Sequence, residues 1–293
     1  MSLVINHNLM AMDAARSLNI SYSRLATSVQ RLSSGLRVNS AMDDAAGLAV
    51  REMMRTDIAV LGQGVRNAND AISLIQTADG ALSVVDEKLT RMKELAEQAA
   101  TGTYTTAQRA IMDSEYQAMA SEITRIANAT DFNGVKLLDG SLSGTAVDGS
   151  AGNQMKIHFG TGNASAEDYY YVRIGNATAS ALGVGNAAAV GAGYTISTQS
   201  AAQASLDAIN SAVAIKDNIR ANLGGIANRL ANTVSVLGIQ AQNLQAAESQ
   251  ISDVDVATEM TEFTRNQILV QAGVSMLAQA NSLPQLALKL MGG

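Results

Sequence analysis

The chain has 293 residues, with 20 Lys and Arg against 26 Asp and Glu, and it contains no cysteine, no tryptophan and one proline. The net charge of −6 argues against non-specific binding to nucleic acid, which needs a positive surface potential. The absence of cysteine excludes disulfide frameworks, thiolate metal sites and cysteine nucleophiles. No run of residues approaches the roughly 20 apolar residues of a membrane span, so we expect no membrane insertion.

The proline and aromatic contents favour long helices. Average usage would give the chain roughly fifteen prolines, whereas Pro284 is the only one, so helices can run uninterrupted almost throughout. Aromatic residues make up 3% of the chain, so burial must come from aliphatic side chains and methionines on narrow helix seams. The composition fits a rod better than a sphere.

The first predicted helix carries a heptad seam. Its apolar positions are separated alternately by four and three residues, which predicts a narrow stripe that packs against one partner helix. In chain order the positions are Ala11, Ala15, Leu18, Tyr22, Leu25, Val29 and Leu32.

A second, longer helix is predicted after the segment SSGLRVNS. Ser40 and Asp43 have the spacing of a capping box, and the helix should run from there to about Ala100. At 1.5 Å per residue it would be roughly 85 Å long, well beyond the usual globular length. Apolar residues recur in it every seven positions, at Leu61, Ala68, Ile75, Leu82, Leu89 and Ala96.

The middle of the chain departs from this helical pattern. A third helix, capped by Thr105 and Gln108, should end near Asn128, and Asn-Gly and Asp-Gly turn signals follow within residues 131–140. The sequence then predicts a small β insert, with strands at 155–159 and 169–174 and an Ala-, Gly- and Asn-rich loop at 175–193.

The last third of the chain returns to helix. Ser200 with Gln203 predicts the cap of a fourth helix, and Ser252 with Asp255 predicts the cap of a last helix that should break at Pro284. The fourth helix keeps a strict seven-residue period at Leu223, Leu230, Leu237, Leu244 and Ile251.

The two ends of the chain carry opposite charge. Residues 1–40 hold four Arg and one Asp, whereas residues 246–293 hold five acidic and two basic side chains. Opposite charge beside matching seams predicts that the two ends lie together; the alternative is two solvated faces that never meet. Surface ion pairs contribute only about 0 to 1 kcal/mol each, so seam burial must supply the stability. Each end alone buries too little to offset backbone ordering and should order only against the other end and neighbouring copies.

No motif points to catalysis. His7 and His158 are the only histidines, and neither has a metal-ligand spacing. Asp43 and Asp44 stand at a predicted helix start, where the helix dipole favours negative charge. We therefore expect neither an enzyme nor a protein with a metal or cofactor.

Several segments of both flanks resemble bacterial flagellin. Together they span the flanks from end to end, roughly 230 residues, while the central region matches no family in this way. The matching segments are LSSGLRVNSAMDDAAGLAV (32–50), RNANDAISLIQTADGAL (66–82), TRMKELAEQAA (90–100), DFNGVKLL (131–138) and LAQANSLPQLALKL (277–290).

The resemblance implies a mainly α fold, a long antiparallel helical coiled-coil bundle with paired terminal helices and a small β-rich insert. Residues 1–42 and 253–293 would form an inner domain that lines the filament channel and drives polymerisation. Residues 43–139 and 196–252 would form the helical bundle of the filament wall. Residues 140–195 would be a short variable insert on the outer surface.

As to function, the resemblance implies a structural subunit that polymerises non-covalently into the extracellular bacterial flagellar filament for motility. It implies export through the flagellar type III apparatus, and as partners other copies of the chain, a secretion chaperone on the C-terminal helix, and hook-associated and cap proteins. The nearest alternative is a hook–filament junction protein. Alternatives from other classes are a monomeric secreted immune-receptor ligand or adhesin, and a hydrolase.

Two sets of residues are candidates for these contacts. Arg91, Leu95 and Glu115 stand at the positions that flagellins present to the vertebrate Toll-like receptor for flagellin, and the first two share one helix face. The same three residues could equally make contacts within the filament. The polymerisation seam is expected at Leu18, Leu25, Val29, Leu32, Leu223, Leu230, Leu237 and Leu244.

Overall fold

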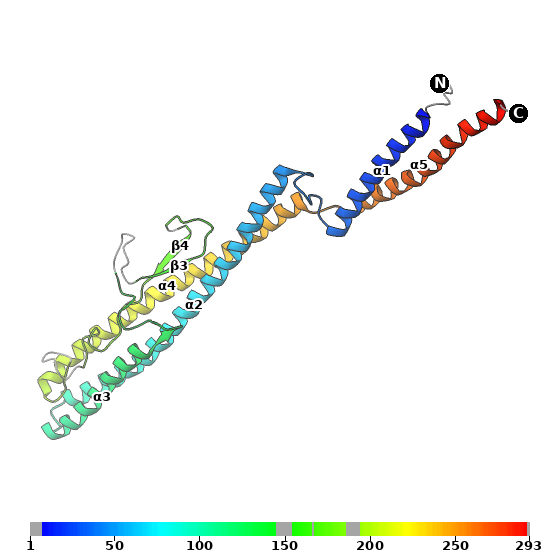
Figure 1. Ribbon diagram of the computed structural model, residues 1–293. Helices are drawn as coiled ribbons and strands as arrows, with labels where there is room; N and C mark the ends of the chain where they lie inside the picture. Colours follow the sequence, from blue (N-terminus) through cyan, green and yellow to red (C-terminus); the bar gives the residue numbers. More distant parts are fainter. Residues whose placement is uncertain (1–7, 145–153, 166, 186–193, 292–293) are drawn as a thin grey trace. The chain divides into compact units, whose positions relative to one another are not determined.

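The computed structural model describes residues 8–144, 154–165, 167–185 and 194–291. Figure 1 shows α2 beside α4 with α3 along them, and α1 beside α5. The chain is mainly helical with small sheets in its middle, so the predicted fold class is confirmed. The helices are α1 (Leu9–Ser34), α2 (Ala45–Ala100), α3 (Thr106–Ala129), α4 (Gln199–Ser252) and α5 (Val256–Met291); the strands are β1 (Asp131–Phe132), β2 (Val135–Lys136), β3 (Met155–His158) and β4 (Tyr169–Val172).

The starts of α2 and α3 follow from local capping. Thr105 and Gln108 form the predicted capping box of α3. The prediction for α2 is wrong by a few residues, because its cap is Asp44, whose Oδ1 accepts the backbone N–H of Gly47 at 2.8 Å. A carboxylate there satisfies one of the free amides of the first turn.

Asp43 organises the turn that precedes α2. Its Oδ2 accepts the backbone N–H and the hydroxyl of Ser40, at 2.9 and 3.0 Å, and the backbone N–H of Asn39 at 3.2 Å. These bonds, led by the Ser40 amide, hold the pKa of Asp43 below its ordinary value. The predicted pairing of Ser40 with Asp43 exists, but it closes a turn rather than a helix.

The later helices begin at similar caps. Thr198 Oγ1 accepts the backbone N–H of Ala201 at 3.2 Å, so α4 begins before the predicted cap at Ser200. The cap of α5 is Asp255 rather than the predicted Ser252, which is the last residue of α4. The Oδ1 of Asp255 accepts the amide of Ala257 at 3.0 Å, and its Oδ2 accepts the hydroxyl of Thr258 at 2.8 Å.

The predicted break at Pro284 is wrong, because α5 continues to Met291. Proline has no N–H, so within a helix it leaves the carbonyl four residues earlier without its donor. That carbonyl belongs to Ala280, and the side-chain Nδ2 of Asn8 donates to it at 2.8 Å. A group from the start of α1 thus satisfies the backbone that Pro284 leaves open.

The strands form two antiparallel hairpins. Asn133 and Gly134 have φ values of 50° and 80° between β1 and β2, as a two-residue hairpin turn of this sequence requires. β3 pairs with β4 in the register His158 to Tyr169, which confirms the two strands predicted in the insert. Residues 175–193 were predicted to form a loop, but the described part of this segment packs into the core. Its residues 175–185 include fully buried Ala177, Ala179, Leu182 and Val184, which belong to the core; residues 186–193 lie outside the described part.

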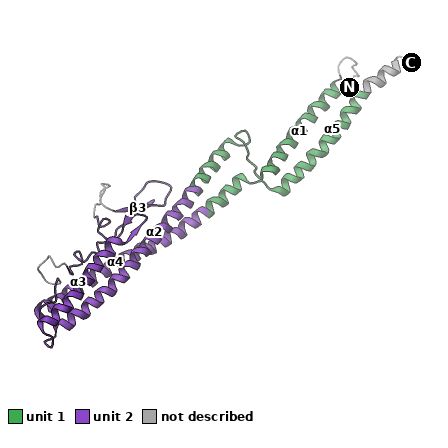
Figure 2. Ribbon diagram, turned by 60° about the horizontal axis from the view of Figure 1, so that its bottom comes forward, with its two compact units in different colours: residues 1–58, 242–293 green, residues 59–241 purple. Residues whose placement is uncertain are grey.

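The chain divides into two compact units, coloured separately in Figure 2. Unit 1 comprises residues 1–58 and 242–293, and unit 2 comprises residues 59–241. Unit 2 holds two clusters of buried side chains. The first packs α2 and α4 against both hairpins, and the second packs them against α3. The segment 177–184 contributes Ala177 to the first cluster and Ala179, Leu182 and Val184 to the second. The predicted seven-residue row of α2 is buried, and all of it except Leu61 belongs to these clusters: Leu61, Ala68, Ile75, Leu82, Leu89 and Ala96.

Candidate assembly surfaces

In unit 1, α1 and α5 pack against each other along a narrow seam. At Gly273 the two backbones come close, because a Cβ built there would lie 3.0 Å from Leu18 Cδ1. Arg31 Nη1 lies 3.6 Å from a carboxylate oxygen of Glu259, a contact between the positive and negative ends of the chain. The predicted pairing of the terminal helices is therefore present.

The seam of α1 is shifted from the predicted row. Leu18, Leu25 and Leu32 are half-buried as expected, but Val29 is 49% exposed and so is Tyr22. The inner positions beside them are taken by serines, of which Ser28 is 4% exposed. A helix of 3.6 residues per turn presents only one narrow stripe to a single partner, so α5 leaves Val29 outside the folded seam.

The outer face of α1 forms a shallow groove of about 650 Å³. Met12 and Ile20 line it and are 63% and 47% exposed. Arg16 and Arg24 line it as well, and neither forms an ion pair with any described residue. The groove thus joins exposed apolar side chains to two cations that form no ion pair within the described part of the chain.

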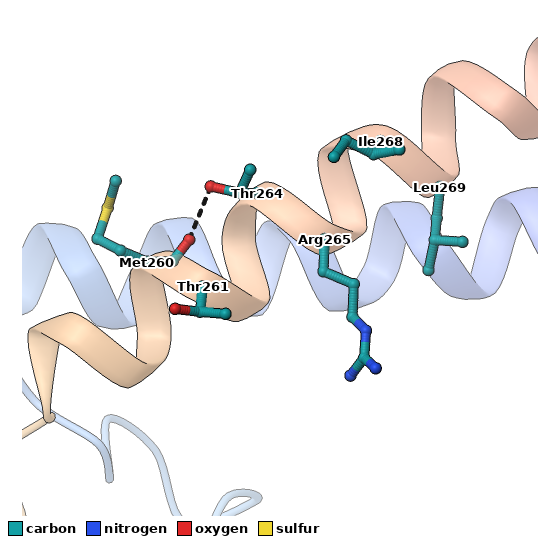
Figure 3. A pocket seen from close by; sticks show the side chains of 6 residues that line it. All are labelled: Met260, Thr261, Thr264, Arg265, Ile268 and Leu269. Atoms are coloured by element: carbon teal, nitrogen blue, oxygen red, sulfur yellow. Dashed lines mark hydrogen bonds between the residues drawn. The ribbon is translucent and has the colours of Figure 1, made fainter.

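α5 has a similar groove of about 570 Å³, shown in Figure 3. Ile268 and Leu269 are 60% and 45% exposed beside Arg265, which forms an ion pair with Glu262 at 3.2 Å. Its lining residues lie along consecutive turns of α5: Met260, Thr261, Thr264, Arg265, Ile268 and Leu269.

The connections from α1 to α2 and from α4 to α5 are bonded to each other. Arg37 N donates to the Ser252 carbonyl at 2.7 Å, and Val254 N donates to the Gly35 carbonyl at 3.1 Å. The guanidinium of Arg37 also reaches the Ile251 carbonyl, at 2.8 Å from Nη2. These bonds satisfy carbonyls at the end of α4 and hold the two connections together.

The remaining predicted seam residues lie on α4. Leu223, Leu230 and Leu237 are 1%, 0% and 6% exposed and belong to unit 2. Leu244 is half-buried and belongs to unit 1. The three buried leucines stabilise the fold of the single chain and are not available as a surface.

The receptor candidates have different environments. Arg91 and Glu115 are exposed and bonded to each other at 2.9 Å, and Arg91 Nη1 also contacts Glu94 at 3.0 Å. The bonds to Glu94 and Glu115 raise the pKa of Arg91 above its ordinary value. Leu95 is 2% exposed and packs in the second cluster of unit 2, so its side chain is not available at the surface for contact with a receptor.

The residues weighed for catalysis have structural roles in the described chain. Asp43 and Asp44 accept backbone amides, as described above. His158 stacks on Tyr169 with ring centroids 6.0 Å apart, and His7 lies outside the described residues. Within the described part, no group of three or more acidic or imidazole side chains could hold a metal ion. No described helix is both long and apolar enough to span a membrane.

Sequence reasoning missed the grooves on α1 and α5. Their exposed residues repeat every four positions, from Met12 through Arg16 and Ile20 to Arg24. That spacing marks one helix face, but it was hidden beside the stronger seven-residue row. An outer face with its own apolar period is the signal that would have found the grooves.

Comparison with known proteins identifies the family. The N-terminal helical region of bacterial flagellin matches residues 5–143, and its C-terminal helical region matches residues 206–291. Flagellin FlaB1 of Treponema pallidum is 40% identical over 99% of this chain and 100% of its own length. A flagellin of Halalkalibacterium halodurans is 42% identical, again over 99% of this chain and 100% of its own length.

A solved structure shares the fold at low sequence similarity. It is a putative flagellar hook-associated protein from Vibrio parahaemolyticus, 18% identical, with a TM-score of 0.55 over 72% of this chain and 100% of its own. This likeness shows the fold alone. The full-length matches are with flagellins and filament core proteins, so the chain belongs to the bacterial flagellin family, whose members are structural rather than enzymatic and polymerise into the flagellar filament.

Proposed function

We propose that this flagellin polymerises through the outer faces of α1 and α5 in unit 1. The observation that supports it is the number of large apolar side chains that these helices leave in solvent. Burying one such side chain contributes about 1.5 to 3 kcal/mol, so a row of them favours a covering partner. They are Leu9, Met10, Met12, Ile20, Tyr22 and Val29 on α1, and Val256, Met260, Ile268, Leu269, Val274 and Met276 on α5.

The partner proposed for these faces is another copy of the chain. The cationic groove of α1 and the groove of α5 have different side chains, so one copy would meet the next through unlike surfaces. An interface between unlike surfaces that does not close on itself generates a helical filament. Arg16 and Arg24 would find carboxylate or carbonyl partners there.

The test compares two substitutions on neighbouring residues of α5. Ile268→Asp places a carboxylate in the groove and should abolish seeded polymerisation, while leaving the helix content of the dilute protein unchanged. Gln267→Asp adds the same charge at an exposed polar position next to it and should still polymerise. Sedimentation after seeding and negative-stain imaging measure both. Normal filaments from Ile268→Asp would refute the proposal.

We further propose the three-part division expected from the family. Residues 1–42 and 253–293 would line the channel, 43–139 and 196–252 would form the wall, and 140–195 would lie outside. In support, α1 pairs with α5, and the core of the chain gathers around α2 and α4. Limited proteolysis of dilute protein tests the division. Both ends should be trimmed first, near residues 42 and 253, to leave a resistant middle fragment.

We also propose that family membership brings the expected partners in assembly. These are the type III export apparatus, a secretion chaperone on α5, and the hook-associated and cap proteins. The exposed apolar side chains of α5 support a chaperone contact, because an uncovered apolar helix face in the cell favours aggregation. Loss of chaperone binding in a chain that ends before Val256 is the expected result.

A second candidate function is recognition of the monomer by the vertebrate Toll-like receptor for flagellin. In support, Arg91 and Glu115 form an exposed polar pair on two neighbouring helices. Leu95 would act by packing beneath them rather than by touching the receptor. A receptor-reporter assay should show a larger loss for Arg91→Ala than for Lys93→Ala, an exposed lysine on the same helix. Equal responses from parent, Arg91→Ala and Leu95→Ala would exclude this surface.

A further inference from the structure

A lysine interrupts the leucine row of α4. Leu223, Leu230 and Leu237 recur every seven residues, and the position seven residues before Leu223 is Lys216. Its side chain is only 3% exposed. Lys216 therefore fills a core position of the heptad, where almost every other residue of unit 2 is apolar.

The buried ammonium group of Lys216 contacts two carboxylates. Lys216 Nζ contacts Asp86 of α2 and, at 2.8 Å, Asp217 of its own helix. One turn along α4, Arg220 Nε contacts Asp79 of α2 at 2.7 Å. Burial lowers the pKa of Lys216, but the bonds to Asp217 and Asp86 outweigh it, so the side chain stays charged.

These ion pairs stand where the two apolar clusters of unit 2 meet. On α2 the first cluster ends at Leu82 and the second begins at Val85. On α4 the second cluster reaches Ala212 and the first begins at Ile219, on either side of Lys216. The ion pairs of Lys216 and Arg220 thus mark one position along a core whose apolar residues otherwise repeat every seven positions.

Stability alone does not explain a charge at this position. Taking the ammonium group of a lysine out of water is costly, and an apolar residue of similar size at such a position is often as stable or more so. The partners Asp86 and Asp217 stay 41% and 61% exposed, so the desolvation falls on Lys216. A single polar residue at a core heptad position has a better supported role, which is to fix the register of the helices. The apolar rows of α2 and α4 both repeat every seven residues, so a slip of one heptad would keep apolar side chains against each other.

The ion pairs distinguish such a slip from the native register. If α4 moved by seven residues so that Lys216 took the place of Leu223, Lys216 would still meet Asp79. Arg220 would then lie beside Ile72 and lose its carboxylate, and Asp86 would face an apolar side chain. One ion pair of two would be lost.

A slip in the opposite direction is worse for the lysine. Lys216 would take the place of Ile209, beside Lys93, so two ammonium groups would face each other. Arg220 could reach Asp86, but Asp79 would be left without a cation. Of these three registers, only the native one pairs Lys216 with Asp86 and Arg220 with Asp79, so that all four charges have a partner.

We propose that Lys216 is a positioning residue that fixes the register of α4 against α2 through its contact with Asp86. This inference goes beyond the proposed function, because it concerns how a single chain selects one fold before it meets another copy. A filament repeats one subunit many times. Chains in two registers would place their assembly surfaces at two different positions along the α2–α4 pair. Register errors would therefore be expressed as poor assembly.

The experiment uses the absence of cysteine from the chain. Spin labels on Gln76→Cys and Asn210→Cys, both exposed, report one α2–α4 distance by pulsed electron paramagnetic resonance. A heptad slip moves α4 by about 10 Å along the pair. The parent should give one distance. Lys216→Met should give a second distance displaced by up to about 10 Å, and Lys216→Arg should restore the single one.

Two controls make the outcome decisive. Lys136→Met removes an exposed lysine from β2 and should leave a single distance. The double variant Lys216→Met/Asp86→Leu leaves no unpaired charge between the helices and decides the question if Lys216→Met alone does not fold. A second distance in the folded double variant supports the proposal. A single parental distance in either folded variant, together with normal polymerisation, would overturn it.

Discussion

The two compact units both carry apolar rows with a seven-residue period, but they bury these rows to different extents. In unit 2, the apolar rows of α2 and α4 are covered by α3, the hairpins and the segment 177–184, and many of their side chains are fully buried. In unit 1, α1 packs against α5, and most of the large apolar side chains described on these two helices stay partly or largely exposed. The difference supports the proposed function, in which unit 2 is stable within a single chain and unit 1 is completed by other copies.

The comparison has an energetic side. A narrow seam between two helices buries little surface against a backbone ordering cost of about 1 to 2 kcal/mol per residue. Unit 2 offsets that cost within one chain, because each helix packs on more than one neighbour. On the proposed function, unit 1 gains the missing burial when other copies cover its outer grooves. The predictions below test this division, from the largest expected effect to the smallest.

The largest effect is expected for a charge in the core of unit 2. Leu237→Asp buries a carboxylate without a partner and should cost more than about 4 kcal/mol of unfolding free energy, enough to abolish folding and polymerisation. Val236→Asp is the matched control, because Val236 is 60% exposed and should unfold at the parental temperature. Thermal unfolding followed by circular dichroism measures both. Parental stability in Leu237→Asp would show that the wall seam is misplaced.

The same truncation should act differently in the two units. Leu82→Ala, in the core of unit 2, should cost about 2 to 5 kcal/mol of unfolding free energy. Leu18→Ala, in the seam of unit 1, should leave the main unfolding transition unchanged and slow seeded polymerisation instead. Urea unfolding and sedimentation give the two readouts. If Leu18→Ala lowered the main transition as much as Leu82→Ala does, the ends would be part of one cooperative fold.

Two glycines of α2 provide a smaller and sharper test within unit 2. A Cβ on Gly64 would lie 2.1 Å from the carbonyl oxygen of Phe159, so Gly64→Ala must displace the β3–β4 hairpin and should cost about 1 to 3 kcal/mol. Gly62 has only the tip of Arg66 nearby, at 4.0 Å. Gly62→Ala should therefore gain up to about 1 kcal/mol from helix propensity. Denaturant midpoints with equal slopes would confirm the opposite signs.

The smallest effect is expected on acidification of the turn before α2 in unit 1. The pKa of Asp43 lies below its ordinary value of 3.8 in the folded chain, so its contribution is present above that pH and is lost as the pH falls through the lowered pKa. The amide resonances of Asn39 and Ser40 should shift in that range. Asp43→Asn should remove the titration at these two amides, and an unchanged titration would assign it to another group.

Much of the fold was predictable because heptad rows and capping residues act locally. The helix ends erred by a few residues where two capping residues stood close together, as at Asp43 and Asp44 or at Thr198 and Ser200. The break expected at Pro284 was wrong for a different reason. Its cost is offset by Asn8, which donates to the carbonyl of Ala280 across 272 positions of sequence, and no local pattern contains that information.

The candidate surfaces were less predictable than the fold. The row of α4 was recognised, yet Leu223, Leu230 and Leu237 proved to be core residues of a single chain. Val29 was predicted in the seam but is half exposed. Leu95 was a candidate for receptor contact but is buried, like the three leucines of α4. A sequence period indicates that a stripe is apolar. It does not indicate whether the stripe is covered by the same chain or by another.

The bond between Asn8 and the carbonyl of Ala280 sets an order of events. When a chain is synthesised or exported from one terminus to the other, Asn8 and Ala280 emerge at widely separated times because 272 positions lie between them. The carbonyl opened by Pro284 can therefore gain its donor only after both Asn8 and Ala280 have been delivered. A copy that lacks either residue could not form this bond between the two terminal helices.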